Sequence, residues 1–108
     1  MITYLIGRSP FREHSIRTTI ATAVLLAQNG EKVRAIFLQD GVIVAIKGNQ
    51  GEDIVQQLSQ AGVDIFYRTE DLTARGIDTG KVTDIGQTID TQEIMAILAD
   101  SSSIVSLL

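Results

Sequence analysis

The 108-residue sequence contains no cysteine and no tryptophan, and only one proline. Without cysteine the chain has no disulfide, no thiolate metal ligand and no sulfur nucleophile. It also lacks the run of about 18 apolar residues that a membrane span requires. Residues 1–6 form a short strand-like run that meets Arg8 almost at once, which is not typical of a signal peptide. We therefore expect a cytoplasmic protein without a metal, a cofactor or a membrane partner.

Cations are scarce as well. Nine Lys and Arg residues stand against thirteen Asp and Glu residues, which gives a formal charge of −4. The chain has no excess of cations to neutralise a phosphate backbone, so direct nucleic-acid binding is not expected. The charge is also uneven, because residues 1–17 carry three arginines and one glutamate, whereas residues 69–108 carry seven acids and two cations. Such a dipolar surface suits a protein partner better than a polyanion.

The composition is that of an ordinary globular domain, with 44% apolar and 20% charged residues. A chain of this length buries roughly two thirds of its unfolded surface, which is enough for one core. We therefore expect a single α/β domain over residues 1–108.

Short apolar runs alternate with amphipathic or capped segments along the whole chain. Strands are predicted at residues 1–6, 32–38, 63–67, 81–85 and 103–108, of which 81–85 is the weakest. Apolar residues at helical spacing predict a helix that runs from residue 16 to a stop at Gly30. Residues 40–47 predict a short turn of helix, although 42–46 fits a strand equally well.

Three further helices are predicted from their capping residues. Asn49 and Glu52 have the spacing of a capping box, as do Asp90 and Glu93. The first box opens a helix that ends at Gly62, and the second opens one that runs through Leu98. A helix of one to two turns, capped by Thr69, covers 69–75.

Strands joined by helical crossovers favour a mostly parallel sheet with helices on both faces. We expect an α/β protein with a small three-layer α/β/α Rossmann-like (flavodoxin-like) fold and about five strands. Sites in such folds lie beyond the carboxyl ends of the strands. The segments to search are therefore 7–14, 39–40, 68–70 and 86–90.

The segment 7–14 is the richest in reactive side chains. Arg8, Ser9 and Arg12 follow the first strand and precede a helix, where a carboxylate, a phosphate or a sulfur oxyanion could bind. His14 is the only histidine and would need a nucleophile beside it to act as a base. The alternatives are that Arg8 pairs with a carboxylate such as Asp40 across the strand ends and that His14 is an ordinary surface residue.

Gln39 and Asp40 follow the second strand. Asp40 could serve as an acid or a base, but Asp is also a preferred N-cap for the short helix that follows. Asp71 and Arg75, four residues apart, predict a modest surface ion pair. Neither the G-x-G-x-x-G dinucleotide fingerprint nor the Walker phosphate-binding pattern is present.

Three short motifs together resemble the DsrH/TusB branch of the DsrE/DsrF/DsrH superfamily. They follow the first three strands and read G-R-S-P at 7–10, L-Q-D-G-V at 38–42 and E-D-L-T-A-R-G at 70–76. The resemblance covers nearly the whole chain. Position 7, where the family pattern has a serine-like residue, is glycine here, and the C-terminal half matches only loosely.

The resemblance implies a subunit of a sulfur-relay complex, built with DsrE/TusD-like and DsrF/TusC-like sister chains. In that family group a cysteine of the DsrE/TusD-like subunit receives persulfide sulfur, for tRNA wobble-uridine 2-thiolation or for intracellular sulfur oxidation. Because a serine alkoxide does not form at neutral pH and does not hold sulfane sulfur, this chain is expected to be a non-catalytic subunit.

Two other readings stay open at this point. One is a stand-alone homo-oligomeric protein that binds an anion or small ligand, or a small enzyme, with its site at Arg8 and Asp40. The other is an oligomeric scaffold without a ligand. Association is supported by the apolar runs 42–46 and 104–108, unless helices on the sheet faces cover them.

Overall fold

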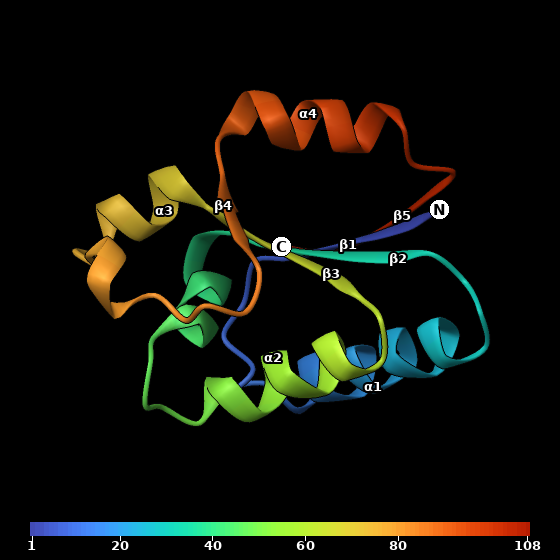
Figure 1. The fold of residues 1–108 in the computed structure, drawn as a ribbon, viewed down its shortest axis with the longest axis horizontal. Coiled ribbons are helices and arrows are strands. Elements are labelled where there is room, and N and C mark those ends of the chain that lie inside the picture. Colours follow the sequence, from blue (N-terminus) through green and yellow to red (C-terminus); the bar gives the residue numbers. More distant parts are fainter.

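Figure 1 shows the computed structural model of the protein, which describes residues 1–108. One five-stranded sheet forms its centre, in the order β4-β3-β2-β1-β5. Its strands are β1 (Ile2–Ile6), β2 (Val33–Phe37), β3 (Asp64–Arg68), β4 (Gln87–Ile89) and β5 (Ser103–Leu107). Every neighbouring pair is parallel. The predicted α/β fold with a parallel sheet of about five strands is confirmed.

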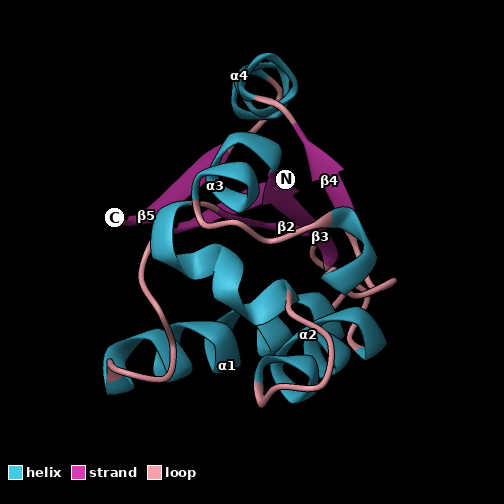
Figure 2. Cartoon of the chain, turned by 90° about the vertical axis from the view of Figure 1, so that its left-hand side faces the viewer, coloured by secondary structure: helices cyan, strands magenta, loops and turns pink.

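Helices lie on both faces of the sheet (Figures 1 and 2). The α-helices are α1 (His14–Gln28), α2 (Gly51–Gln60), α3 (Thr69–Ala74) and α4 (Thr91–Ala99), and two 3-10 helices are η1 (Gln39–Ala45) and η2 (Thr79–Lys81). The helices α1 and α2 cover one face, and α4 alone lies over the other, which gives the three expected layers. No helix has both the length and the apolar character needed to cross a membrane.

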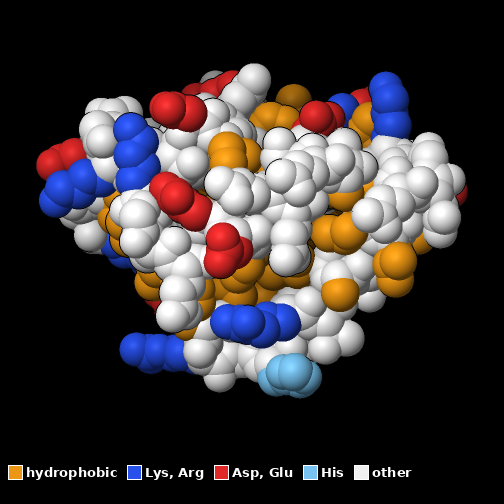
Figure 3. Space-filling model, turned by 60° about the horizontal axis from the view of Figure 1, so that its bottom comes forward, with side chains coloured by type: hydrophobic (Ala, Val, Ile, Leu, Met, Phe, Trp, Pro, Cys, Tyr) orange, Lys and Arg blue, Asp and Glu red, His pale blue; other side chains and the backbone are white.

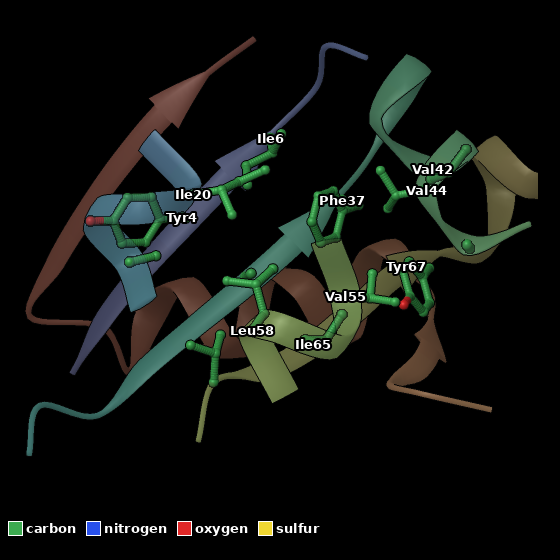
Figure 4. Packing of buried hydrophobic residues seen from close by; sticks show 14 of the residues in the cluster. Tyr4, Ile6, Ile20, Phe37, Val42, Val44, Val55, Leu58, Ile65 and Tyr67 are labelled. Carbon is green, nitrogen blue, oxygen red and sulfur yellow. The ribbon is translucent and has the colours of Figure 1, made fainter. Parts of the chain in front are cut away.

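The larger core lies between the sheet and the α1 and α2 layer (Figure 4). The rings of Phe37 on β2 and Tyr67 on β3 stack at its centre, with centroids 6.0 Å apart and an interplanar angle of 27°. Val42 and Val44 of η1 are fully buried in the same cluster. The ambiguous run 42–46 is therefore mainly a 3-10 helix that closes the core, and only Ile46 makes a bridge, with Val82.

A smaller core lies under α4. It consists of Ile36 on β2, Ile89 on β4 and Ile94 on α4, with partly buried neighbours around them. Because a single helix covers this face, the strand at the β5 edge receives little cover from it.

One predicted capping box is confirmed and the other is wrong. The Asp90 side chain accepts from the Glu93 N–H and the Glu93 side chain accepts from the Asp90 N–H, as predicted. In the other pair, the Asn49 side chain accepts from Gly51 N–H, while Glu52 accepts from Gly48 N–H rather than from Asn49. The helix begins at Gly51. A Cβ at this position would lie 2.6 Å from the Cα of Val44, so glycine lets the start of the helix pack directly on η1.

Two further predictions around β4 are wrong. Thr69 does not cap α3, because it is the first helical residue and its hydroxyl donates to the Ile89 carbonyl. Residues 81–85 do not form a strand. The chain instead leaves η2 as a loop in which the buried Val82 bridges to Ile46 and the carbonyl of Ile85 accepts from the Tyr67 hydroxyl at 2.7 Å. The apolar residues of this segment pack on the core without joining the sheet.

Gly41 provides a test of how closely η1 packs on β1. A Cβ at residue 41 would lie 2.2 Å from the Ile6 carbonyl oxygen, which is part of the backbone and has little room to move. We expect Gly41→Ala to lower the free energy of unfolding by roughly 3 kcal/mol, the upper end of the usual cost of overpacking. Urea unfolding measures this loss. The control is Gly80→Ala, because no atom lies within 4 Å of its added Cβ. Equal stability of the two variants would contradict the packing described.

Tyr67 predicts how stability changes at alkaline pH. Burial raises the pKa of the Tyr67 phenol, whereas the same phenol in the unfolded chain ionises near pH 10. Its contribution to stability is therefore complete below about pH 10 and is lost as the pH rises further. We expect Tyr67→Phe to flatten the fall of unfolding free energy above pH 10, measured by urea unfolding at a series of pH values. Slopes are compared rather than absolute values, because the variant also loses the hydrogen bond to Ile85. An unchanged slope would contradict the prediction.

Candidate functional site

The loops that follow β1, β2 and β3 meet at the carboxyl edge of the sheet, because the three strands are parallel neighbours. A hollow of about 400 Å³ lies between the first two loops. Its lining residues are Arg8, Ser9, Arg12, Glu13, Asp40 and Ile43. Four of the six predicted site residues therefore share one hollow, while His14 and Gln39 lie outside its lining.

The Arg8 guanidinium is held on the β5 side of this hollow. Its Nη1 lies 3.1 Å from Oε2 of Glu13, and its Nε donates to the Leu108 carbonyl at 3.2 Å. Arg8 therefore pairs with a carboxylate, as the alternative predicts, but the partner is Glu13 of its own loop and not Asp40 across the strand ends. The physical reason is that Asp40 is bound by Arg75, the residue that follows α3.

Ser9 and Arg12 belong to the turn before α1. The Ser9 hydroxyl oxygen accepts from the Phe11 N–H at 3.3 Å, and the Ser9 carbonyl accepts from the Arg12 N–H at 3.2 Å. Ser9 is thus buried and shapes the turn. The side chain of Arg12 makes no ion pair or hydrogen bond within the chain and is exposed. Arg12 is consequently available to a partner or ligand.

His14 is the first residue of α1 and is exposed. Its imidazole makes no hydrogen bond to Ser9 or to any other residue. The structure therefore places no nucleophile against this histidine, in agreement with the alternative of an ordinary surface residue.

Asp40 is bound by Arg75, the residue that follows α3. Its Oδ1 accepts from Nη2 of Arg75 at 2.9 Å and from Nε at 3.2 Å. The predicted role of Asp40 as an N-cap is wrong, because η1 begins one residue earlier, at Gln39, and has no side-chain cap. A bidentate contact of this kind fixes both the distance and the orientation of the two groups.

Sequence reasoning underestimated Asp71, which it placed in a surface ion pair. Asp71 is only 8% exposed. Its Oδ2 accepts from the Gln39 N–H at 2.8 Å and from Nη1 of Arg68 at 3.2 Å, and its Oδ1 lies 3.4 Å from Nη1 of Arg75. Gln39 has a φ of +51°, an unfavourable value for a residue with a side chain, which the hydrogen bond from its own N–H to the carboxylate helps to hold.

The contacts continue from Arg68 to α4. Nη2 of Arg68 donates to the Thr91 hydroxyl at 2.8 Å, and the Thr91 N–H donates to Oε2 of Glu70 at 3.1 Å. The hydrogen bond from the Thr91 side chain is the main cause that lowers the pKa of the Glu70 carboxyl. We call the connected side chains the carboxyl-edge network. Its members are Asp40, Arg68, Glu70, Asp71, Arg75 and Thr91.

This arrangement suits recognition better than acid–base chemistry. The acids of the network are engaged by arginines or by Thr91, and no group of three His, Asp or Glu side chains is placed to hold a metal ion. What the network does provide is a connection between the loop after β2, the loop after β3 and the start of α4. The segment 86–90, which the sequence also indicated for a site, contains β4 itself. It therefore does not lie beyond the carboxyl end of a strand.

Comparison with known proteins identifies relatives over most of the chain. Residues 8–103 match the family model described as DsrH like protein. Protein TusB of Escherichia coli is 30% identical over 86 residues, which is 80% of this chain and 84% of that protein. Protein TusB of Photorhabdus laumondii is 32% identical over 87 residues, 81% of this chain and 80% of that protein.

The fold is also found among solved structures. The YchN protein of Escherichia coli superposes with a TM-score of 0.88 at 15% sequence identity and covers 98% of this chain and 97% of its own. A protein of unknown function from Methanobacterium thermoautotrophicum superposes with a TM-score of 0.77 at 14% identity, over 98% of this chain and 96% of its own. These structural likenesses support the fold alone.

The Asp71 carboxylate provides the test of the carboxyl-edge network. We expect Asp71→Asn to lower the unfolding free energy by about 3 kcal/mol, because two partly buried guanidinium groups lose their shared counter-charge. Asp40→Asn is the matched control, since the Asp40 side chain is 67% exposed and its ion pair contributes at most about 1 kcal/mol. Urea unfolding measures both. Equal losses in the two variants would contradict the central position of Asp71.

Proposed function

The chain belongs to the DsrH-like protein family, and from this premise we propose that it is a non-catalytic subunit of a sulfur-relay complex. In this proposal it assembles with a cysteine-bearing sister chain of the DsrE/TusD-like type, together with a DsrF/TusC-like chain. The complex would act in the cytoplasm, in tRNA wobble-uridine 2-thiolation or in intracellular sulfur oxidation.

The observation that carries the proposal is the meeting of three motif loops at one edge of the sheet. The motifs at 7–10, 38–42 and 70–76 are distant in sequence, yet each follows one of three neighbouring parallel strands. Asp71 contacts Gln39 of the second loop and Arg75 of the third. The second and third loops are thus joined to each other, and the first is joined to the end of β5 by the hydrogen bond from Arg8 to Leu108. Loops held by such contacts favour docking of a preformed surface.

The absence of a thiol assigns the sulfur chemistry to the partner. Persulfide transfer forms and breaks bonds at a thiolate sulfur, and no side chain of this sequence carries one. Ser9 does not replace it. The Ser9 hydroxyl is buried in a turn, and the His14 imidazole makes no hydrogen bond with it. The role left to this chain is to hold a cysteine-bearing subunit in position.

The hollow beside Arg8 and Asp40 supports the alternative of an anion or small-ligand site less well. Arg8 and Asp40 are bound to Glu13 and Arg75 respectively, so within the hollow Arg12 alone offers an unengaged cation. A single exposed arginine is a common contact in protein interfaces, where arginine is enriched. We therefore place Arg12 on the docking surface for the sister subunit.

The test is native mass spectrometry of this chain after co-expression with a cysteine-bearing DsrE/TusD-like chain of the same organism. We expect a mixed complex, and we expect Arg12→Glu to raise its dissociation constant at least about tenfold through charge reversal at the interface. The control is Lys32→Glu, which reverses an exposed cation just before β2, at the amino ends of the strands.

Failure to form any mixed complex would overturn the proposal. A complex that responds equally to both reversals would keep the assembly and remove Arg12 from its interface. A rise in melting temperature with sulfate or thiosulfate that Arg8→Ala abolishes would instead favour the ligand-binding alternative.

A further inference from the structure

The strand β5 is the least covered part of the sheet. Four of its five residues are exposed, and Ile104 and Val105 keep 49% and 36% of their surface accessible. In Figure 2, β5 forms one edge of the sheet, and α4 lies above the middle of the sheet. Of the two apolar runs that the sequence offered for association, 42–46 is largely buried, so 104–108 is the one left accessible.

This edge lacks the features that usually keep sheet edges apart. Natural edge strands are protected by charged side chains, proline, bulges or short length. Residues 101–108 contain no charged residue and no proline, and β5 pairs with β1 in an unbroken register over five residues. The opposite edge strand, β4, has only three residues, of which two are exposed and polar. The two edges of the sheet are therefore chemically different.

The register shows which backbone groups of β5 have no partner. The Ser103 N–H donates to the Met1 carbonyl, and the Leu107 carbonyl accepts from the Gly7 N–H. Because backbone groups of successive residues point to opposite sides of a strand, residues 103, 105 and 107 bond to β1. The N–H and C=O groups of Ile104 and Ser106 consequently face the open edge.

We propose that β5 pairs in antiparallel fashion with β5 of a second copy of this chain, about a two-fold axis at Val105. In this register Ile104 lies opposite Ser106 of the second copy, and each such pair exchanges two N–H···O=C hydrogen bonds. All the unpaired groups of Ile104 and Ser106 are then satisfied. The two five-stranded sheets become one continuous sheet.

The side chains of β5 fit this register. Val105 shares a face with Tyr4, its register partner on β1, and so points to the α1 side of the sheet. On the two-fold axis Val105 meets Val105 of the second copy as a non-hydrogen-bonded pair, the closer of the two pair types, and β-branched pairs stabilise such positions.

The distribution of charge permits a second copy at this edge. Two chains that each carry a net charge of −4 repel each other unless they meet through uncharged surface. Neither β5 nor residues 18–28 of α1, the adjacent helix on the Val105 face, carry a charged side chain. In Figure 3 hydrophobic and uncharged side chains fill the lower right of the view, while charged groups lie on the left and along the top.

The experiment measures the mass of the purified chain by light scattering and native mass spectrometry. We expect twice the 11.7 kDa chain mass at a protein concentration of about 100 µM, because mass action favours the dimer at high concentration. Val105→Lys places two ammonium groups opposite each other, and Ser106→Pro removes an outward N–H without touching the bonds to β1. Both variants should have the monomer mass, or should dimerise with a dissociation constant at least about tenfold higher than that of the wild-type chain. Their circular dichroism spectra should be unchanged. Thr88→Lys, an exposed change on the β4 edge, is the matched control and should remain dimeric.

A monomeric wild-type chain would overturn the proposal, as would a dimer that both β5 variants retain. If Val105→Lys does not fold, Ser106→Pro decides the matter, because proline is tolerated on an open edge. Hydrogen exchange of the Ile104 and Ser106 amides in the wild-type chain gives an independent readout, since both should slow as the protein concentration rises. If the wild-type chain is monomeric but still forms a mixed complex with the sister chain, the β5 dimer is wrong and the proposed function stands. If it forms the β5 dimer but binds no sister chain, the proposed function is wrong and the dimer stands.

Discussion

The Asp71 carboxylate is the interaction on which the carboxyl edge of this protein depends. It accepts the backbone N–H of Gln39 and lies between the guanidinium groups of Arg68 and Arg75. A buried carboxylate is costly unless it is paired and hydrogen-bonded, and here both conditions are met. The same contacts join the end of β2, the end of β3 and α3. The left-handed backbone of Gln39, the start of η1 and the position of Arg75 against Asp40 all follow from this one group.

The topology explains why such a group is needed. In a parallel sheet the loops that leave β1, β2 and β3 arrive at one edge, where they have no ladder partners. The loop after β2 must also enter η1 close to the carbonyl of Ile6, which Gly41 permits. Apolar packing brings these segments together but does not orient them, because the hydrophobic effect is non-directional. For the loops after β2 and β3, directional hydrogen bonds to the shared Asp71 carboxylate provide the orientation.

Local chemistry predicted much of the fold. The strand and helix alternation, the parallel sheet and the Asp90–Glu93 capping box follow from neighbours in sequence, and each is confirmed. The incorrect predictions involve tertiary partners. Thr69 bonds to Ile89 on another strand, and Val82 bridges to Ile46, so both depend on contacts that local spacing does not encode. The weak strand predicted at 81–85 is wrong because its apolar residues pack against the core from a loop.

The candidate site, like the fold, was predicted in its local features but not in its tertiary contacts. Placing Arg8, Ser9, Arg12 and Asp40 at one edge required only the rule that parallel strands share their carboxyl ends, and the four residues do line one hollow. Their pairing was not predictable, because Arg8 and Asp40 each had several oppositely charged candidates in the sequence. Asp71 was visible as a partner of Arg75 at helical spacing, but its burial depends on Gln39 and Arg68, which lie on other elements.

Pairing also changes how the uneven charge of the sequence is to be understood. The arginines of the N-terminal region and the acids of the C-terminal region do not simply form two opposite poles. Arg8 is neutralised within its own loop by Glu13, and much of the acidic charge near 70 is matched by Arg68 and Arg75. What is left is a carboxyl edge with paired charges around an unengaged Arg12, and an edge strand, β5, whose own side chains carry no charge. An edge of the first kind discriminates between partners through ion pairs, whereas one of the second kind associates through backbone hydrogen bonds and apolar contact. The proposed sister subunit and the proposed second copy would therefore bind at separate surfaces of one small sheet.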